Sequence, residues 1–369
     1  MYNSRNTYAQ INLKNIKLNT EYIINKYKNY DYYFGVVKAD AYNHNSVKVS
    51  KEIIDAGCNY LAVASILEAV EIRKGLKKYG DKYISIPILC LENSKITKLY
   101  LLNCLKYNIT ITINSLETLN IILRVKNVFK IDITNLKIHI KVDTGMNRLG
   151  ISDKDDFNKV VNLLNNNNIY LEGIYTHIFK AIDKDSYLKQ INTFKDITSC
   201  IDLNKIKIVH IPQSETLIKY DKLDFVNGTR LGIIMYGFLD NSLKSTFSLY
   251  SEVIQINNIK KGESVGYNGN YIAKEEKEII ATISIGYADG VVRNFTGAYV
   301  YINDKKYNIV GSVCMDMLMI KVDENVKLYD KVAILKDNNH ILDIARHLNT
   351  IGYEVICNIG KRVLRRYIK

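Results

Sequence analysis

The sequence predicts an α/β protein in which an N-terminal (β/α)8 TIM-type barrel is followed by a C-terminal, mainly β domain. Two patterns indicate this order. As far as about residue 237, eight short apolar runs alternate with helix-length amphipathic segments, which is typical of a parallel barrel. From residue 246 onward the apolar runs are shorter and more closely spaced, as in antiparallel sheets. We therefore expect one domain at residues 1–237 and a second at residues 238–369.

Each barrel strand is expected at an apolar run of three to six residues, with a helix before the next run. A helical pattern at residues 15–28 precedes the first strand. The clearest helices between strands are expected at residues 46–56, 65–79, 115–126, 154–165 and 187–201. The expected strands lie at residues 34–37, 60–64, 86–91, 109–113, 138–142, 171–175, 206–210 and 225–227.

In the second domain the pattern predicts six strands and a single helix. The helix is expected at residues 340–348. The strands are expected at residues 253–256, 279–285, 299–302, 309–313, 317–322 and 331–335.

The net charge of the 369-residue chain is +13, which raises the question of nucleic-acid binding. Its lysines are scattered and no block of five or six like charges is present, so we expect no nucleic-acid partner. The six cysteines form no CxxC pair and most lie in apolar runs, which indicates reduced, buried thiols in a cytoplasmic protein. We expect no metal site. With neither a signal-peptide pattern nor a bilayer-length apolar run, no membrane association is expected.

Polar side chains follow five of the predicted barrel strands, at the end where such barrels carry their active sites. Lys38 follows the first strand, at the edge of an apolar wall where desolvation lowers the pKa of an amine. A neutral amine there can form a Schiff base with an aldehyde cofactor or act as a base; a lysine that only marks the strand end is the alternative. The others are Arg148 after the fifth strand, His177 after the sixth, Ser214 after the seventh and Arg230 after the eighth.

The residues around Lys38 read Val-Val-Lys-Ala-Asp-Ala-Tyr and resemble the pyridoxal-phosphate lysine signature of alanine racemases, VVKADAYGHG. Asn43 and Asn45 replace the two glycines of that signature, and asparagine tolerates the left-handed backbone region better than any residue except glycine. Further motifs of the family follow in order as far as about Tyr353. They lie at residues 141–150 (with Asn147 for a glycine), 175–177, 210–214 (with Pro212 and Gln213 as departures), 229–237, 265–269, 285–290 and 314–317.

The resemblance implies pyridoxal 5'-phosphate as cofactor and gives roles to residues of this chain by their motif positions. Lys38 and Tyr267 would be the catalytic bases, on the D and L faces of the substrate's α-carbon. Many family members carbamylate the lysine that corresponds to Lys141, which would create an anion that fixes Arg148; a lysine facing water is the alternative. Substrate contacts are implied for Arg148, Tyr287 and Met315, and cofactor contacts for Lys38, Tyr42, His177, Ser214, Arg230, Gly232, Ile233 and Tyr353.

In the family, the arginine at the position of Arg230 faces the pyridine nitrogen of the cofactor. Arginine keeps its proton at accessible pH, so the nitrogen would stay unprotonated. The pyridine ring would then be a weaker electron sink than one that faces an aspartate. The resemblance therefore favours racemisation over side reactions such as transamination.

The implied function is the interconversion of L-alanine and D-alanine, supplying D-alanine for peptidoglycan. A head-to-tail homodimer with two composite active sites is implied, because the family brings the tyrosine at position 267 across from the partner subunit. A serine or broad-specificity racemase is an alternative, since asparagine replaces glycine at positions 43, 45 and 147. A non-catalytic pyridoxal-phosphate-binding barrel protein is a candidate from another class, but such proteins end with the barrel. A nucleic-acid binder, suggested by charge alone, ranks last.

Overall fold

The computed structural model describes residues 5–92 and 94–369, and its contacts divide the chain into two compact units. The first unit comprises Lys17–Ala41 and Asn45–Met235 and contains the barrel. The second comprises the described residues up to Ile16, Tyr42–His44 and Tyr236–Lys369. The second unit is therefore built from three separate stretches of sequence.

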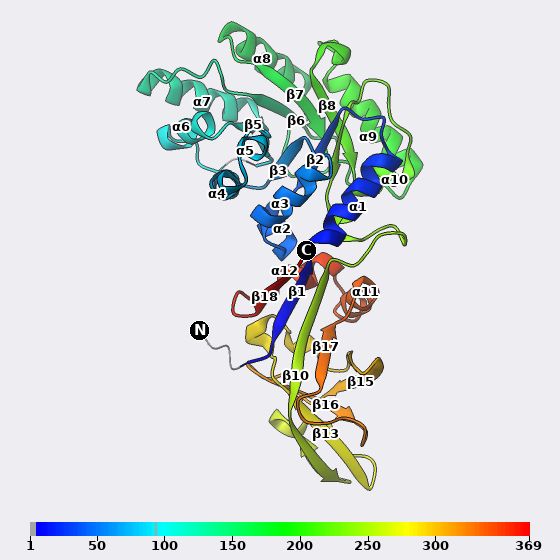
Figure 1. Cartoon of the computed structure of the whole chain (residues 1–369). Helices are drawn as coiled ribbons and strands as arrows, with labels where there is room; N and C mark the ends of the chain where they lie inside the picture. Colours follow the sequence, from blue (N-terminus) through cyan, green and yellow to red (C-terminus); the bar gives the residue numbers. More distant parts are fainter. Residues whose placement is uncertain (1–4, 93) are drawn as a thin grey trace. The chain divides into compact units, whose positions relative to one another are not determined.

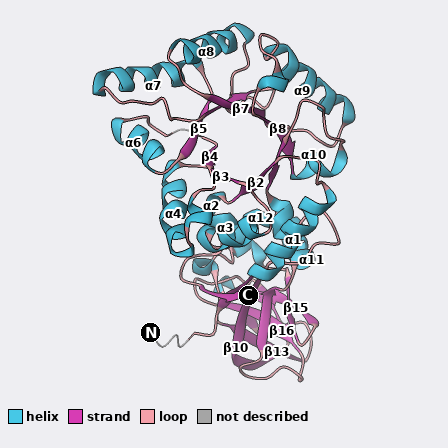
Figure 2. Cartoon of the chain, turned by 45° about the horizontal axis from the view of Figure 1, so that its top comes forward, coloured by secondary structure: helices cyan, strands magenta, loops and turns pink. Residues whose placement is uncertain are grey.

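Eight parallel strands close into a barrel in the first unit, which confirms the predicted fold (Figure 2). Strands that are consecutive in the barrel pair in parallel, and β9 closes the ring against β2. All residues of β3 to β6 are buried, as expected for parallel strands with helices outside and side chains packed inside. The strands are β2 (Tyr32–Val36), β3 (Tyr60–Val63), β4 (Ile88–Cys90), β5 (Ile109–Ile113), β6 (Ile138–Val142), β7 (Leu171–Thr176), β8 (Ile208–Gln213) and β9 (Gly228–Leu231).

Helices surround the barrel on its outside, and side-chain caps fix where several of them begin (Figure 2). Ser65 and Glu68 form a capping box at the start of α4, each satisfying a backbone N–H of the other. Asp153 and Asp183 cap α8 and α9 through their carboxylates. The helices are α1 (Leu13–Lys26), α3 (Ser46–Asp55), α4 (Ile66–Leu76), α5 (Asp81–Ile84), α6 (Lys98–Lys106), α7 (Leu116–Phe129), α8 (Lys154–Asn166), α9 (Lys184–Ile197) and α10 (Ser214–Lys219).

The eighth barrel strand differs from the prediction. It was expected at residues 225–227, but β9 spans Gly228–Leu231, so Arg230 lies within the strand and not after it. Val226 is buried, but it lies in an irregular segment between a turn at residues 224–225 and the start of β9. In this segment Asn227 hydrogen-bonds the ends of neighbouring strands through its backbone and side chain. The apolar residues thus precede the strand, while the strand itself carries the buried polar residues Thr229 and Arg230.

The second unit is built on one eight-stranded sheet, in the order β13-β16-β15-β14-β17-β10-β1-β18, which confirms the mainly β prediction. The 14-residue strand β10 pairs with β1, β17 and β13 (Figure 1). A bulge between Val253 and Gln255 shifts its register with β13. The strands are β1 (Tyr8–Asn12), β10 (Phe247–Lys260), β13 (Lys277–Ile283), β14 (Tyr299–Ile302), β15 (Lys305–Val310), β16 (Leu318–Val322), β17 (Lys331–Leu335) and β18 (Leu364–Ile368).

Two helices accompany this sheet, where the pattern predicted one. The predicted helix is α11 (Asn338–His347), which Asp337 caps by accepting from the His340 N–H. The second helix, α12 (Gly352–Cys357), has only six residues, too few for a clear helical period in the sequence. A short two-stranded ribbon of β11 (Ser264–Val265) and β12 (Tyr271–Ile272) completes the unit.

The cysteines are all free thiols, and Cys58, Cys90 and Cys104 are buried as expected. Cys200 and Cys357 are exposed, which corrects the expectation of buried thiols at those positions. No helix in the described part of the chain has both the length and the apolar character that crossing a bilayer requires.

Candidate active site

The chain takes a left-handed course immediately after Lys38. The short helix α2 (Lys38–Asn43) follows β2, and residues 39–43 have φ angles between 52° and 67°. L-amino acids resist this conformation by roughly 1–2 kcal/mol per residue, and such strain persists only where surrounding contacts impose it. A run of left-handed residues next to Lys38 is therefore a sign of a functional site.

Hydrogen bonds within the barrel unit hold the start of this turn. The Ala39 N–H donates to Glu68 Oε1 at 2.7 Å, and the Ser46 N–H donates to Asp40 Oδ1 at 2.7 Å. The Ala41 N–H donates to the Val37 carbonyl at 2.9 Å. These contacts fix the backbone on both sides of the strained residues.

The three asparagines that stand where the family has glycine all adopt left-handed backbone. Their φ angles are 67° at Asn43, 76° at Asn45 and 54° at Asn147. This outcome agrees with the expectation that asparagine tolerates this region. Asn43 also donates to the carbonyls of Ile356 and Ile359 at 2.8 Å each, which a glycine could not do.

Asp143 organises the loop that carries Arg148. One carboxylate oxygen accepts the N–H groups of Gly145 and Asn147 at 2.8 and 3.2 Å, and the other accepts that of Arg148 at 3.1 Å. Gly150 closes the loop with φ of 126°, and a Cβ there would lie 2.7 Å from the Asp143 nitrogen. The backbone of Arg148 is thus fixed, while its exposed guanidinium has no hydrogen bond to another described residue.

Lys141 is a buried lysine without a polar partner. It lies within β6 and is 6 % exposed, so the alternative of a strand-end lysine facing water is wrong. Its Nζ makes no hydrogen bond within residues 5–92 and 94–369, and its nearest aromatic ring, that of Tyr175, is centred 5.9 Å away. Burial, together with the charges of Arg148 and Arg230, lowers the pKa of Lys141 to about 8.

Arg230 is a buried arginine with four of its five N–H groups already in use. Nη1 donates to Nδ1 and to the carbonyl of His210 at 2.8 and 2.7 Å. Nη2 donates to the carbonyls of Thr176 and Ile211 at 2.7 and 3.1 Å. The Nε–H has no acceptor among the described residues, so one donor of this charged group is open. Burial lowers the pKa of Arg230 to about 10, and the side chain therefore stays protonated at neutral pH.

His177 lies directly after β7, as predicted, and is held neutral. Burial lowers its pKa to about 3, and the charges of Arg230, Arg148, Lys141 and Lys38 act in the same direction. The structure thus brings four cationic side chains around one neutral imidazole at the end of the barrel. Such a concentration of positive charge is suited to an anionic ligand.

Ser214, Gly232 and Ile233 meet where β8 and β9 end. Ser214 is buried and follows β8 directly, as predicted, and its Oγ accepts the Gly232 N–H at 3.0 Å. Ile233 begins a single 3₁₀ turn (Ile233–Tyr236) shortly after β9. This hydrogen bond satisfies the Gly232 N–H and links Gly232 to Ser214.

Tyr42 and Tyr353 are brought together in the second unit. Their ring centroids lie 6.3 Å apart, edge to face, and Tyr236 lies 4.8 Å from Tyr42. Burial raises the pKa of Tyr42 well above its usual range, so its hydroxyl is protonated and able to donate. The sequence placed these tyrosines in one group by resemblance, and the structure places their rings in contact.

The three remaining candidates, Tyr267, Tyr287 and Met315, lie on the surface of the second unit. They are 69 %, 41 % and 54 % exposed. The Tyr287 N–H donates to the Cys314 carbonyl at 3.0 Å, so the segments of Tyr287 and Met315 run side by side. A Cβ on Gly286 would lie 2.3 Å from the Cys314 oxygen, and this close approach requires glycine.

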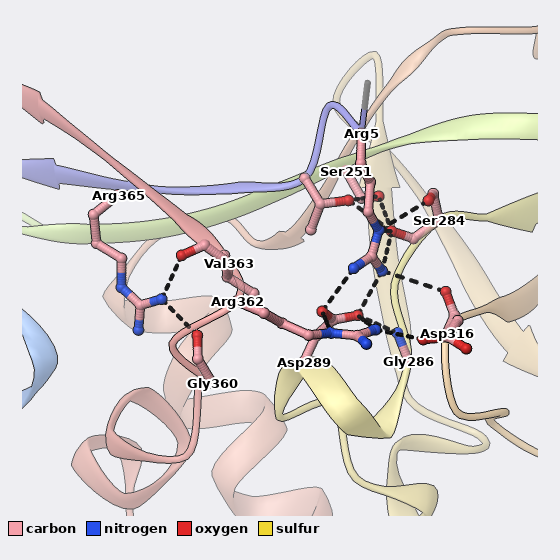
Figure 3. A network of polar contacts seen from close by, with 11 residues as sticks. Arg5, Ser251, Ser284, Gly286, Asp289, Asp316, Gly360, Arg362, Val363 and Arg365 are labelled. Carbon is pink, nitrogen blue, oxygen red and sulfur yellow. Dashed lines mark hydrogen bonds and ion pairs between the residues drawn. The ribbon is translucent and has the colours of Figure 1, made fainter. Parts of the chain in front are cut away.

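A buried carboxylate fixes these two segments to the ends of the chain (Figure 3). Asp289 is fully buried and accepts from both Arg5 and Arg362, and from the Gly286 N–H at 2.9 Å. Arg362 Nη2 also donates to Asp316 Oδ1 at 2.5 Å. The network joins the turn of Tyr287 to the segment of Met315.

Sequence reasoning missed a group of polar side chains inside the barrel. Its members come from β3, β6, β7 and β8, and all are buried. The available signal was a polar residue at an inward position of an otherwise apolar strand, as in Ile-His-Ile-Lys-Val at β6. The residues are Tyr60, His139, Glu172 and His210.

Fold and site together define a two-domain barrel enzyme with a positively charged active end. The chain also matches two described protein families, "Alanine racemase, N-terminal domain" at residues 11–240 and "Alanine racemase, C-terminal domain" at residues 246–367. The chain belongs to the alanine racemase family.

Individual relatives agree along the whole length. The alanine racemase of Clostridium tetani is 35 % identical over 389 residues, covering 99 % of this chain and 96 % of that protein. Alanine racemase 1 of Bacillus subtilis is 32 % identical over 381 residues, covering 99 % and 94 %. The crystal structure of the Bacillus anthracis alanine racemase with bound L-Ala-P superposes with a TM-score of 0.87 at 31 % identity, covering 99 % of this chain and 95 % of that one.

Proposed function

We propose that this protein interconverts L-alanine and D-alanine with pyridoxal 5'-phosphate as its cofactor. The observation that carries the proposal is the cluster of Lys38, Lys141, Arg148 and Arg230 around the neutral His177, in a chain of the alanine racemase family. The reaction's substrate and the proposed cofactor both carry anionic groups, which this cluster attracts.

The residues of the barrel fit the proposed cofactor. The open Nε–H of Arg230 would meet the pyridine nitrogen, and the neutral ring of His177 would stack on the pyridine. Lys38 would hold the cofactor aldehyde as a Schiff base. When bound, the cofactor would withdraw electrons from the substrate's α-carbon and so make its hydrogen removable as a proton. The phosphate contacts that the motifs assign to Tyr42, Ser214, Gly232, Ile233 and Tyr353 remain part of the proposal.

Racemisation requires a base on each face of the α-carbon. We assign Lys38 to the D face and Tyr267 to the L face, and the substrate carboxylate to Arg148, whose guanidinium has no partner of its own among described residues. A tyrosine is a poor base at neutral pH because its reference pKa of about 10 keeps its hydroxyl almost entirely protonated. Positive charge of the kind that surrounds His177 would stabilise the deprotonated tyrosine oxygen.

Two copies of the chain would build each active site. Besides Tyr42 and Tyr353, the second unit carries the site candidates Tyr267, Tyr287 and Met315, and these three lie exposed on this chain. A head-to-tail homodimer would bring Tyr267, as base, and Tyr287 and Met315, as substrate contacts, to the partner's Lys38. The exposure of these three side chains supports this arrangement, because a partner subunit can reach them.

Lys141 is proposed to be carbamylated. Its pKa of about 8 leaves a fraction of neutral amine at neutral pH, and the neutral amine is the form that reacts with carbon dioxide. The product would be an anion within the cationic cluster, where it would pair with Arg148. From family membership alone we also propose a cytoplasmic location and a supply of D-alanine for peptidoglycan.

Racemisation is tested directly with purified protein, added pyridoxal phosphate and each alanine enantiomer, by following optical rotation. Conversion in both directions is expected, and Lys38→Ala should abolish it. Borohydride treatment of the wild type should then leave the cofactor covalently on the peptide that contains Lys38. Absence of racemisation by cofactor-loaded protein, or attachment at another lysine, would contradict the proposal. Serine tested under the same conditions distinguishes a broader racemase.

A further inference from the structure

A line of buried polar side chains extends behind Arg230 through the barrel interior. It runs from Arg230 (β9) to His210 (β8), His139 (β6) and Glu172 (β7), which are 4 %, 0 %, 0 % and 1 % exposed. Arg230 Nη1 lies 2.8 Å from His210 Nδ1, and His210 Nε2 lies 2.9 Å from His139 Nδ1. His139 Nε2 faces Glu172 Oε2 at 3.4 Å, and it has no aligned hydrogen-bond partner.

Elementary chemistry fixes the direction of each contact. A guanidinium can only donate, so His210 Nδ1 must be the acceptor and carry no proton. His210 Nε2 then carries the proton of a neutral imidazole and donates to His139 Nδ1. By the same reasoning His139 carries its proton on Nε2, which faces the carboxylate of Glu172. Every donor in the line therefore points away from Arg230 and towards Glu172.

Burial is consistent with two neutral imidazoles. Desolvation lowers the pKa of both His139 and His210, and the Arg230 charge acts in the same direction on each. Glu172, at the other end, is ionised: its pKa is lowered to about 2 by His139, Lys207 and Tyr60, against the effect of burial. Lys207 Nζ lies 3.0 Å from Oε1, and the Tyr60 hydroxyl donates to Oε2 at 2.8 Å. The line thus connects a buried cation to a buried anion.

The barrel interior is shaped around the two imidazole rings. A Cβ on Gly173 would lie 2.7–2.8 Å from three ring atoms of His139, and one on Gly228 would lie 2.9 Å from the His210 Cβ. Glycine at these positions leaves room that no other residue would leave. The rings therefore occupy places for which the neighbouring strands are adapted.

Aromatic rings hold His210 in its plane. Phe34 and Tyr175 stack on it with centroids 4.4 and 4.5 Å away and interplanar angles of 19° and 14°. A stacked ring cannot turn over without unpacking its neighbours, so the acceptor Nδ1 stays aimed at Arg230. The stacking therefore determines the orientation of the His210 ring, and the contact with Arg230 determines its tautomer.

We propose that Glu172, through His139 and His210, is a positioning residue for Arg230. The anion polarises both imidazoles in one direction, which keeps an acceptor in front of Nη1 and leaves Nε–H as the donor offered to the cofactor. This inference rests on the proposed function, because it assumes that Arg230 serves a bound pyridine ring. Glu172 is not a catalytic residue; it acts through three others.

Glu172→Gln tests the proposal by removing the charge while preserving the shape. Nitrogen-15 NMR of the six histidines, in cofactor-free protein, reports the tautomers without any need for activity. In the wild type we expect neutral His139 and His210 with the proton on Nε2. In Glu172→Gln we expect both histidines to keep these tautomers, since Arg230 fixes them, but their Nε2 resonances to shift as the N–H bonds lose polarisation. We also expect a dissociation constant for pyridoxal phosphate raised about tenfold and kcat for alanine lowered about tenfold, with KM within about twofold.

Glu278→Gln is a matched control. Glu278 is also a buried carboxylate of lowered pKa, held by a tyrosine hydroxyl (Tyr271) and a lysine (Lys321), but it lies in the second unit. This variant should be destabilised to a similar degree while the Nε2 resonances of His139 and His210, cofactor affinity and kcat stay at wild-type values. If Glu172→Gln behaves like Glu278→Gln in all three, or shifts the Nε2 resonances without altering cofactor affinity and kcat, the proposal is overturned.

A second pair of variants separates polarity from packing. His139→Leu removes the acceptor for His210 Nε2–H, whereas His139→Gln offers an amide that can accept from His210 and donate to Glu172. We expect His139→Leu to lose cofactor affinity and kcat as Glu172→Gln does, and His139→Gln to recover part of both. Equal behaviour of the two would overturn the proposal. A wild type that does not racemise alanine defeats the proposed function instead, and the NMR comparison still tests the line of hydrogen bonds.

Discussion

Arg5 and Asp289 form a two-bonded ion pair although 284 residues separate them: Nη1 meets Oδ1 at 2.8 Å and Nη2 meets Oδ2 at 2.6 Å. Arg362 contacts the same two oxygens, through Nε at 2.6 Å and Nη2 at 3.3 Å (Figure 3). Both guanidinium groups lower the pKa of Asp289 below its usual value, so the buried carboxylate stays ionised. The turn of Tyr287 is thereby attached to both ends of the chain.

Asp289→Asn should destabilise the protein by about 3 to 5 kcal/mol, because two arginines would lose their anion inside the network. It should also raise KM for alanine, since Asp289 holds the turn of Tyr287 through the Gly286 N–H. Denaturant unfolding and steady-state kinetics measure both effects. Asp304→Asn breaks an exposed pair with Lys336 and should change neither. A stable Asp289→Asn variant with unchanged KM would show that the network neither stabilises the protein nor holds the turn of Tyr287 for substrate binding.

His177 predicts a pH dependence of stability in the cofactor-free protein. Its pKa is about 3 in the folded chain and about 6.5 when unfolded, so only the unfolded chain takes up this proton between those values. The contribution of neutral His177 to the free energy of unfolding is therefore fully present above pH 6.5. It falls, by at most about 1.4 kcal/mol per pH unit, as the pH drops towards 3.

His177→Gln should make that dependence shallower. It should not abolish it, because the pKa values of His139 and His210 are lowered as well and give the same sign. Unfolding free energies measured at several pH values between 6.5 and 4 test this. Identical slopes for wild type and variant would show that His177 is protonated in the folded state.

Lys141 should carry a carbamate. Protein prepared in carbon-13 bicarbonate should show a carbamate resonance that Lys141→Gln lacks, and that variant should have KM for alanine raised about tenfold as Arg148 loses its anion. Lys205→Gln, which alters an exposed lysine, should keep both the resonance and the KM. A wild type without the resonance would contradict the proposed carbamate.

Complementation tests the composite site. Lys38→Ala and Tyr267→Phe subunits are each expected to be inactive, but a mixed dimer would have one site with both changes and one with neither. Random mixing should restore about a quarter of wild-type activity. Lys38→Ala mixed with the double variant should restore none. If mixed dimers form, as shown by native mass spectrometry, and no activity returns, Tyr267 serves its own subunit's site.

The sequence predicted the barrel well because buried parallel strands are continuous apolar runs, as in Ile109–Ile113. It misplaced β9 because Thr229 and Arg230 are polar residues buried by specific hydrogen bonds, which hydrophobicity does not register. The left-handed course of residues 39–42 was also invisible, because alanine and tyrosine rarely adopt positive φ; Asn43, which follows them, did carry a sign of it. Lys38, His177 and Ser214 could be placed because they lie just after strand ends.

The interior line of His210, His139 and Glu172 shows a further limit. Its meaning depends on which atoms face each other across three strands, and spacing along the chain does not contain that information. Resemblance supplied roles at motif positions, and it assigned none to these three residues. Only the three-dimensional arrangement shows that they form one polarised set.

The central claim, that Lys38 and Tyr267 act on opposite faces of alanine, is tested most directly by hydrogen exchange. Tyr267→Phe, loaded with cofactor in deuterium oxide, is given each enantiomer, and incorporation of deuterium at the α-carbon is followed by NMR. Exchange should fall far more for L-alanine than for D-alanine, because Lys38 still serves the D face. Equal loss of exchange for the two enantiomers would contradict the assignment of the faces.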